Sequence, residues 1–476
     1  MELNESQIAS IVERVAARLQ DKPPEQAKET PELSPADGFF PTVDEAVEKA
    51  CSAQHDLVKL PVEQRKEIIA TVRRRLEERV DELSLLAVNE TGMGRYEDKL
   101  KKNQLAIRKT PGVQILEPIA WSGDHGLSIM ERAPYGVIGS ITPSTNPSET
   151  IICNAIGMIA AGNAAVFNAH PAAREVSALT IKTINQAVAE AGGPSQLLTS
   201  VVEPTVETAQ EIMKHEGIGL LVVTGGVGVV KVAMQSGKKV IAAGPGNPPV
   251  VVDDTADIDK AARDIVNGAA LDNNIVCLVE KEVIALDCIT DKLKQAMKRC
   301  RAMELSPNQL RRLEGLLVEE GPQHQGHGLP NKNFIGKDAG IILKETGVEA
   351  DEGVRLLFAE TDRDHPFVWV EMMMPVIPLV RVRDIDEAIC LAKEVEQDFR
   401  HTAVMHSRNI DHLSRMARVA DTAIFVKNGP SYAGLGLGGE GYTSFTIAGP
   451  TGEGLTSAIH FARERRCVLV DSFRIV

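Results

Sequence analysis

The sequence lacks the features that mark several large protein classes. No apolar run approaches the ~20 residues that a membrane-spanning helix needs, so we expect no membrane partner. The seven cysteines are odd in number and include no CxxC pair, which argues against a zinc cluster or a disulfide framework and favours a reducing, intracellular compartment. Basic blocks are scarce apart from Arg73-Arg74-Arg75, and 66 acidic residues outnumber 52 basic ones. A nucleic-acid partner is therefore not expected.

What the chain does have is the composition of a globular protein, with 43% hydrophobic and 25% charged residues. Its 476 residues predict two or three domains. The first 20 residues carry acidic side chains and no continuous apolar core, so they are unlike a secretory signal.

Residues 1–20 instead predict a short amphipathic helix. Its apolar side chains recur at helical spacing in one narrow stripe: Ile8, Ile11, Val12, Val15 and Leu19. Residues 21–40 are rich in proline and read as a linker. A helix this short cannot bury its stripe within its own length. We expect it to dock, either on the protein's own body or in the groove of a partner.

From Tyr135 onward the pattern alternates between strand and helix. The expected strands are 136–142, 164–168, 197–203 and 218–226, and the helices between them are 150–163, 172–191 and 205–215. This alternation predicts an α/β fold with a parallel sheet. The turn Gly225-Gly226-Val227-Gly228 lies between a strand and a helix, where such sheets bind dinucleotides. A formal GxGxxG match over 434–439 lacks that context and is interpreted as a flexible loop.

A second α/β unit begins near Pro248, with a strand at 250–254 and a helix at 257–271. Cys277 follows in a polar loop, a position that suits a reactive thiol better than an apolar element does. Residue type alone leaves a structural role for Cys277 open. We interpret the other six cysteines as structural, with Cys153 and Cys390 inside apolar elements.

Several motifs in order resemble the aldehyde dehydrogenase superfamily. PYGVIGSITPSTNP (134–147) is similar to its first cofactor-domain strand and loop, and VTGGVGV (223–229) to its dinucleotide turn. NNIVC places Cys277 on the nucleophile of the family, and Glu371 matches the glutamate that binds the nicotinamide ribose. The resemblance runs from about residue 45 to the C-terminus and implies a Rossmann-like cofactor domain, an α/β catalytic domain and a small β oligomerisation element.

The resemblance also implies a set of cofactor contacts. The residues expected to bind NAD are Thr142, Pro143, His170, Thr224, Gly225, Gly226, Gly228 and Glu371. His170 replaces the lysine that usually meets the adenine ribose. Thr145 occupies the position of the oxyanion-binding asparagine, with Asn146 next to it, so which of the two holds the oxyanion stays open. NAD rather than NADP is expected on family resemblance alone.

One departure from the family pattern indicates which branch of the superfamily this sequence resembles. Hydrolytic members carry a glutamate that activates water, and Ala242 occupies its position here. Because alanine cannot act as a base, a thioester on Cys277 needs another nucleophile, and the thiol of coenzyme A (CoA) is the natural choice. The C-terminal text also resembles the CoA-acylating aldehyde dehydrogenases of bacterial microcompartments. That branch implies oxidation of acetaldehyde or propionaldehyde to acyl-CoA, with acetaldehyde favoured. A hydrolytic or phosphorylating enzyme, or a non-catalytic cargo protein, is the alternative.

The branch further implies an organisation and a location. We expect an NAD-binding domain over 41–114 and 133–247, a catalytic domain over 248–430, and an oligomerisation element over 115–132 and 445–476 that forms a homodimer or homotetramer. Residues 1–20 resemble an encapsulation peptide that binds a shell or cargo protein of a microcompartment in the bacterial cytoplasm. We interpret His401 and His406 as structural, and the loop 321–333 with His324 and His327 as a surface loop rather than a metal site.

Overall fold

The computed structural model describes residues 33–321, 326–349 and 353–476. The compact unit considered below spans Pro35–Val476. The predicted encapsulation helix over 1–20, most of the linker over 21–40 and His324 lie outside the described residues. In the described part of the chain, every helix is too short or too polar to cross a bilayer.

The first sheet is parallel and contains six strands. Their order is β1 (Phe39–Phe40), β6 (Leu198–Val201), β5 (Ala164–Asn168), β4 (Val137–Ile141), β7 (Leu220–Thr224) and β8 (Val240–Ala243). β4 and β5 are buried along their whole length, as continuous apolar runs in a parallel sheet require. β4 pairs with both β5 and β7, so the chain order reverses there and opens a crevice at the carboxyl ends of β4 and β7.

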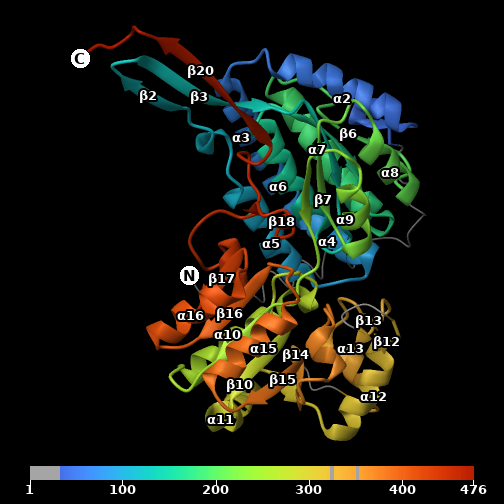
Figure 1. Ribbon diagram of the computed structural model, residues 1–476. Coiled ribbons are helices and arrows are strands. Elements are labelled where there is room, and N and C mark those ends of the chain that lie inside the picture. Colours follow the sequence, from blue (N-terminus) through green and yellow to red (C-terminus); the bar gives the residue numbers. More distant parts are fainter. Residues whose placement is uncertain (1–32, 322–325, 350–352) are drawn as a thin grey trace, which may run out of the picture. The chain divides into compact units, whose positions relative to one another are not determined.

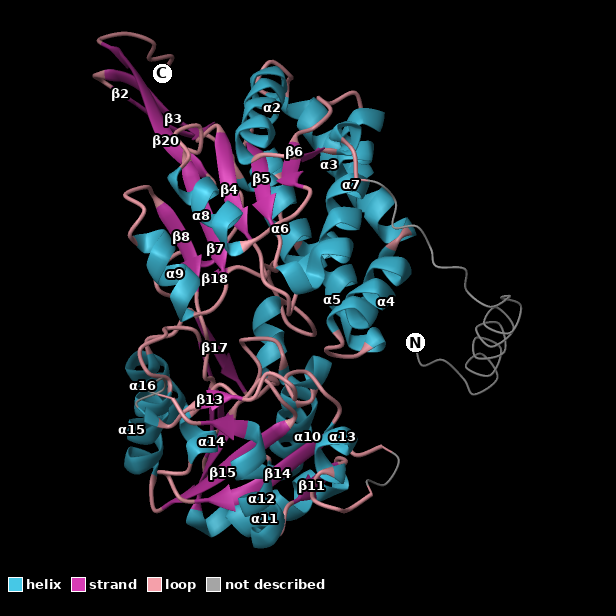
Figure 2. Ribbon diagram, turned by 90° about the vertical axis from the view of Figure 1, so that its right-hand side faces the viewer, coloured by secondary structure: helices cyan, strands magenta, loops and turns pink. Residues whose placement is uncertain are grey.

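Helices cover this sheet, as Figure 2 shows. They are α2 (Val43–Leu57), α3 (Val62–Glu78), α4 (Val80–Thr91), α5 (Tyr96–Lys109), α6 (Pro147–Ala160), α7 (Arg174–Glu190), α8 (Val206–Lys214) and α9 (Val227–Met234). Every residue of α6 is buried, because this helix packs against α5 and α7 as well as β5. That central position matters for function, since the loop before α6 carries Thr145 and Asn146.

The second sheet contains seven parallel strands. Their order is β11 (Ala302–Glu304), β14 (Leu356–Thr361), β15 (Val376–Val382), β10 (Glu282–Leu286), β9 (Pro249–Val252), β16 (Thr402–His406) and β17 (Ile424–Lys427). The helices of this region are α10 (Ile258–Ala269), α11 (Asp287–Arg299), α12 (Pro307–Leu317), α13 (Ala339–Lys344), α14 (Pro366–Trp369), α15 (Ile385–Val395) and α16 (Ile410–Ala420). Cys390 lies exposed on α15, so its predicted place in an apolar interior is wrong.

A third, antiparallel sheet projects as an arm, seen at the top of Figure 1. It contains β2 (Ile119–Gly123), β3 (Gly126–Pro134) and β20 (Ala462–Val470), with β3 in the middle. Every residue of β20 after Ala462 is exposed. The oligomerisation element was expected to span 445–476, but the residues before β20 are not part of the arm. β18 (Ile447–Ala448) is buried, pairs with β19 (Gly454–Leu455) and contacts β8 of the first sheet.

Candidate active site

Cys277 lies in the loop between η4 (Leu271–Asn274) and β10, as predicted. Three consecutive residues of η4, Asp272, Asn273 and Asn274, have φ angles of 49°, 54° and 69°, in the left-handed region that short polar side chains tolerate. Lys281 holds this loop from the far side. Its buried ammonium donates to the Asn274 carbonyl at 2.7 Å, to Asn274 Oδ1 at 2.6 Å and to the Val276 carbonyl at 3.3 Å. The loop is therefore fixed although it lacks regular structure.

The Cys277 thiol is only partly exposed. Burial raises the pKa of this thiol to about 12, and the carboxylate of Glu371 adds to the effect. The ammonium groups of Lys281 and Lys102 act in the opposite direction and favour the thiolate. In the resting protein the group is therefore a thiol at neutral pH. The neighbouring charges either oppose or favour its ionisation to the thiolate.

Gly246 brings the predicted nucleophile together with two other groups. A Cβ atom on Gly246 would lie 2.6 Å from the Cys277 carbonyl oxygen and 2.9 Å from Cγ of His401. The Gly246 amide also donates to Oε1 of Glu371 at 3.2 Å. Burial raises the pKa of Glu371, and the nearby Lys281 opposes this rise. Glycine is needed here because any side chain would collide with the loop of the nucleophile.

His401 is a site residue that the sequence reading missed. It is 1% exposed, its Nδ1 lies 2.9 Å from Thr402 Oγ1, and its Nε2 has no hydrogen-bond partner among the described residues. Burial, together with the charge of Lys281, lowers the pKa of His401 to about 3, so the ring is neutral. No sequence motif marks this histidine. It comes directly before β16, far from Cys277 along the chain, and only the fold brings the two regions together. The prediction that His401 is only structural does not account for a buried Nε2 that has no hydrogen-bond partner among the described residues, on a ring that borders Gly246.

The other histidines lie elsewhere. His406 ends β16, at the opposite end of that strand from His401. Burial lowers its pKa to about 4. His327 stacks on Trp369, with ring centroids 5.2 Å apart. Among the described residues, neither histidine forms a hydrogen bond with Gly246, Cys277 or Glu371.

The two oxyanion candidates come directly before α6. The Thr145 carbonyl accepts a hydrogen bond of 2.5 Å from Nζ of Lys99. The Oδ1 atom of Asn146 accepts one of 2.5 Å from Nζ of Lys102, and its Nδ2 donates to Thr145 Oγ1 at 3.3 Å. Asn146 is 6% exposed, while Thr145 is half-buried. Both candidates are therefore held by lysines of α5.

These lysines belong to a buried ionic network. Oδ2 of Asp272 lies 2.6 Å from Nζ of Lys102 and 3.1 Å from Nζ of Lys99. Glu149, in the first turn of α6, lies 3.0 Å from Lys102. All four side chains are at most 1% exposed. Because Asp272 precedes Cys277 in its loop, α5 joins the oxyanion candidates to the loop of the nucleophile.

At the switch point between β4 and β7, the glycine turn before α9 borders open space. Gly226 caps α9, and Cβ atoms placed on Gly226 or Gly228 would meet nothing within 4 Å, so the turn borders open space. Its backbone N–H groups at a helix start suit a pyrophosphate. Thr142 directly follows β4, next to the end of β7. Its Oγ1 is buried and has no hydrogen-bond partner among the described residues. Thr224 Oγ1 lies 2.9 Å from Thr446 Oγ1.

The remaining predicted contacts frame this crevice. Pro143 follows Thr142 and is half-buried. His170 lies exposed at the end of β5, and its Nδ1 accepts from the Ala172 amide at 3.1 Å. Loss of hydration against the surrounding protein lowers the pKa of His170, and the charge of Lys332 lowers it further. The ring is therefore uncharged. Ala242 is fully buried in β8, and its amide donates to Thr451 Oγ1 at 3.1 Å.

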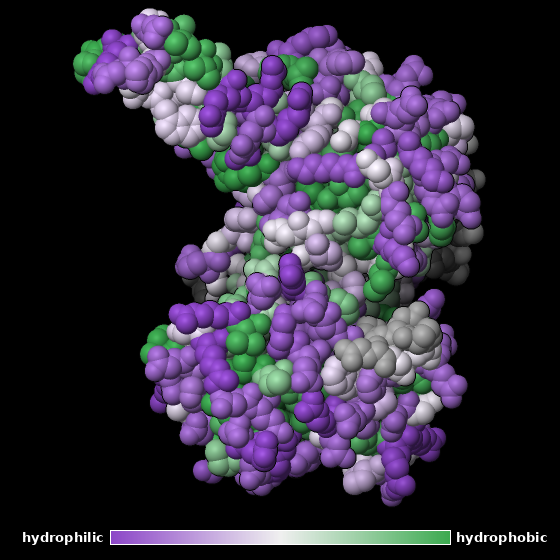
Figure 3. Space-filling model, in the orientation of Figure 1, coloured by the Kyte–Doolittle hydropathy of each residue, from purple (hydrophilic) through white to green (hydrophobic). Residues whose placement is uncertain are grey.

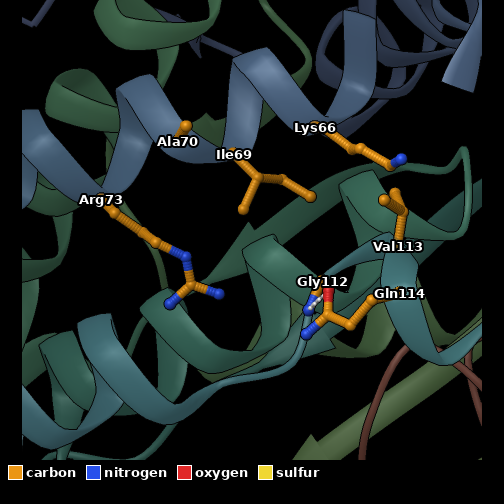
Figure 4. A pocket seen from close by; sticks show the side chains of 7 residues that line it. All are labelled: Lys66, Ile69, Ala70, Arg73, Gly112, Val113 and Gln114. Carbon is orange, nitrogen blue, oxygen red and sulfur yellow. Dashed lines mark hydrogen bonds between the residues drawn. The ribbon is translucent and has the colours of Figure 1, made fainter. Parts of the chain in front are cut away.

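Two cavities lie apart from these groups. Figure 4 shows the first, about 260 Å³ between α3 and the turn around Val113, with the aliphatic side chain of Ile69 between the charged ends of Lys66 and Arg73. The second, about 950 Å³, borders β14, α12 and α15. None of the predicted site residues lines either cavity. The chemistry is therefore placed by the loops around Gly246 and not by these cavities.

Comparisons with known proteins agree with this arrangement. The sequence model described as "Aldehyde dehydrogenase family" matches residues 26–326. The acetylating acetaldehyde dehydrogenase EutE of Salmonella typhimurium is 49% identical over 475 residues, covering 100% of both chains. Rhodopseudomonas palustris propionaldehyde dehydrogenase, solved with bound CoA and an acylated cysteine, has a TM-score of 0.89 at 49% identity, covering 91% of this chain and 98% of its own. A propionaldehyde dehydrogenase from the Clostridium phytofermentans fucose utilisation bacterial microcompartment has a TM-score of 0.89 at 46% identity, covering 92% and 100%.

Proposed function

The chain belongs to the aldehyde dehydrogenase family, and on that premise we propose that it converts a short-chain aldehyde to an acyl-CoA. The aldehyde, NAD and CoA are consumed, and acyl-CoA, NADH and a proton are formed. Cys277 is the nucleophile, and Glu371 and the turn Gly225–Gly228 hold the cofactor. Two relatives named for acetaldehyde are 48% and 49% identical to this chain, and relatives named for propanal or propionaldehyde are 44% to 49% identical, so both aldehydes are proposed as substrates.

The observation that carries the proposal is the alanine at position 242. Ala242 is fully buried in a strand. Its methyl group cannot take a proton from water, and solvent does not reach this position to act as the base instead. A thioester on Cys277 then persists until a stronger nucleophile than water arrives. The CoA thiol is such a nucleophile, and a thioester exchange with it is nearly balanced in free energy.

In the first half of the reaction, the Cys277 thiolate adds to the aldehyde carbon. Lys281 and Lys102 favour that thiolate. The carbonyl oxygen becomes an oxyanion, which the Cys277 backbone N–H and the loop of Thr145 and Asn146 stabilise. One such donor is typically worth ~3 kcal/mol of barrier. NAD, when bound, supplies the acceptor for the hydride that leaves the same carbon. An acyl thioester on Cys277 remains.

In the second half, the CoA thiol attacks this thioester, and its proton must leave. His401 is neutral, its ring borders Gly246 as the Cys277 carbonyl does, and its Nε2 has no hydrogen-bond partner among the described residues. We assign it as the acceptor of the thiol proton, which requires that the pKa of the ring rise from its resting value of about 3 once CoA and the acyl group are in place. The acyl group moves to CoA, Cys277 leaves as thiolate, and the cycle is of the ping-pong type.

The test is NAD reduction by the purified protein with acetaldehyde and with propionaldehyde, each with and without CoA. We expect turnover only with CoA, acyl-CoA detected by mass spectrometry, and loss of both in a Cys277→Ala variant. Equal turnover without CoA would mean that water reaches the thioester despite Ala242. The enzyme would then be hydrolytic. The ratio of the two rates assigns the preferred aldehyde.

We also propose that the arm formed by β2, β3 and β20 joins copies of this chain. β20 is an edge strand with exposed apolar side chains, Val468 at 57%, Leu469 at 44% and Val470 at 63%. Figure 3 shows apolar surface on this arm. Unpaired apolar edges are a liability unless another chain covers them. Val468→Lys with Val470→Lys should lower the mass measured by light scattering, whereas Val206→Lys, also exposed, should not.

The proposed location is a bacterial microcompartment. Two observations support it: the amphipathic stripe of residues 1–20 on a proline-rich linker, and a similar enzyme from such a compartment. A fluorescent protein fused to residues 1–20 should co-purify with shells. The same fusion with Ile11→Asp and Val15→Asp should not, because these changes remove the apolar stripe. Equal recovery of the two fusions would overturn this proposal.

A further inference from the structure

Lys102 of the buried ionic network does more in this reaction than favour the Cys277 thiolate. We propose that Lys102 is a positioning residue that orients the Asn146 carboxamide, which makes Asn146 Nδ2 the side-chain donor to the oxyanion. This inference rests on the proposed function, since it concerns the oxyanion of that reaction. It also chooses between Thr145 and Asn146.

The argument begins with the chemistry of the two side chains. A carboxamide presents an acceptor on one side and two N–H donors on the other. An ammonium group only donates, so a carboxamide turned by 180° would place its donors against a cation. Lys102 Nζ lies 2.5 Å from Asn146 Oδ1, which excludes the turned orientation. The NH₂ group of Asn146 must therefore face away from Lys102.

Lys102 is itself held firmly. It donates a hydrogen bond to Asn146 Oδ1 at 2.5 Å and forms ion pairs with Asp272 Oδ2 at 2.6 Å and Glu149 Oε1 at 3.0 Å. Burial alone lowers the pKa of Lys102, but the carboxylates of Asp272 and Glu149 outweigh it and raise the pKa overall. The side chain is therefore charged at neutral pH and does not release the carboxamide by losing its proton.

Asn146 is better prepared than Thr145 to act as the donor. The donor of Thr145 is its hydroxyl, which accepts the long 3.3 Å contact from Asn146 Nδ2 and has no acceptor among the described residues that fixes the direction of its own proton. Among the described residues, that weak contact is the one acceptor of Asn146 Nδ2. The NH₂ group therefore has donor capacity left for a charge that develops during the reaction. Asp272 joins the same lysine to the loop of Cys277, so donor and nucleophile share one support.

The experiment is a double-mutant cycle on the step that forms NADH before CoA is added. The variants are Asn146→Ala, Lys102→Met and the two combined, with Lys99→Met as a matched control. Lys99 is an equally buried lysine on the same Asp272, but it contacts the backbone of Thr145 instead of the carboxamide. Rate constants are measured by stopped flow with saturating NAD, and thermal unfolding is recorded in parallel.

We expect Asn146→Ala to slow NADH formation about 100-fold, the usual effect of losing one oxyanion donor. Lys102→Met should slow it at least 10-fold, and the combined variant should be no slower than Asn146→Ala alone. Lys99→Met should couple more weakly with Asn146→Ala than Lys102→Met does, because Lys99 contacts the backbone of Thr145 and not the carboxamide. The KM for the aldehyde should change little, since the donor acts on the transition state.

Two further measurements keep the outcomes distinct. Lys102 also favours the Cys277 thiolate, so the rate of Cys277 alkylation by iodoacetamide is measured in each variant. If Lys102 acted only on the thiolate, Lys102→Met would slow alkylation and its effect would multiply with Asn146→Ala. Asn146→Asp keeps an oxygen for Lys102 but loses the NH₂ group. It should fold like the parent and still be slow. If Lys102→Met does not fold, Lys102→Arg completes the cycle.

The inference is overturned if Asn146→Ala and Asn146→Asp retain full activity, or if the effects of Lys102 and Asn146 multiply. Failure of the proposed function looks different. In that case the parent protein itself forms no NADH from an aldehyde, and Cys277 carries no acyl group in mass spectra.

Discussion

The Gly246 amide donates a 3.2 Å hydrogen bond to Oε1 of Glu371, which ties the carboxylate expected to bind the cofactor to the loop that touches Cys277. Glu371 is 8% exposed and lies close enough to raise the pKa of the Cys277 thiol. Under the proposed cofactor role of Glu371, cofactor binding and nucleophile ionisation share one group.

Gly246 should not tolerate even one added methyl group. In Gly246→Ala the new Cβ would lie 2.6 Å from the Cys277 carbonyl oxygen, so the loop of the nucleophile must move. We expect a loss of about 1–3 kcal/mol in the free energy of unfolding and at least a tenfold fall in kcat/KM. Gly226→Ala is the control, because a Cβ there meets open space. It should unfold like the parent while binding NAD more weakly.

The pH dependence of Cys277 alkylation should follow a raised pKa. Since burial and Glu371 raise the pKa of the thiol to about 12, the rate in the absence of NAD should climb about tenfold per pH unit from 7 to 9 without a plateau. Glu371→Gln removes a negative charge that opposes the thiolate, so it should speed alkylation at each pH. Peptide-level mass spectrometry separates Cys277 from the exposed Cys288, Cys390 and Cys467. A plateau below pH 8, or slower alkylation in the variant, would contradict this reading.

His401 should matter after NADH formation. In His401→Gln we expect the first turnover of NADH to stay near that of the parent, while steady-state turnover with CoA falls about 100-fold, as loss of a general base typically does. His406→Gln is the matched control, since that buried histidine lies at the other end of β16 and should leave both rates unchanged. Equal losses in the first turnover and in the steady state would instead place His401 in the structure of the site.

Asp272 should carry much of the local stability. Asp272→Asn leaves two fully buried lysines without their shared carboxylate, which should lower the free energy of unfolding by about 3–5 kcal/mol. Asp259→Asn breaks an exposed pair with Arg299 and should cost less than about 1 kcal/mol. The comparison is made by chemical denaturation at pH 7. A loss below 1 kcal/mol for both variants would show that Lys99 and Lys102 find other partners.

The same aspartate should make the free energy of unfolding depend on pH in acid. Burial acts to raise the pKa of Asp272, but the charges of Lys102 and Lys99 outweigh it, so the pKa is lowered overall. A lowered pKa means that this contribution is complete above the ordinary carboxyl range, near pH 4, and is lost as the pH falls through the folded-state value. The difference in stability between the parent and Asp272→Asn should therefore be constant from pH 5 to 8 and shrink in stronger acid.

The residues near Cys277 show what the sequence determined alone. The alternation of apolar runs and helices predicted strands such as β5 and β9 to within two residues, because strand and helix periods are local properties of the chain. The turn of Gly225 and the loop of Cys277 were placed by motifs whose spacing is short. The substitution at Ala242 needed no coordinates to argue against water as the acyl acceptor.

Tertiary structure decided how distant elements meet. Lys99, Lys102 and Asp272 are ordinary charges in the sequence, and only the packing of α5 between the loop before α6 and η4 makes them a buried network. His401 reaches Cys277 because β16 is a neighbour of β9 in the second sheet. Cys390 was placed wrongly because the apolar face of a helix depends on what covers it. Chemistry that rests on neighbours close in the chain can be read from the sequence. Chemistry that rests on long-range packing waits for the fold.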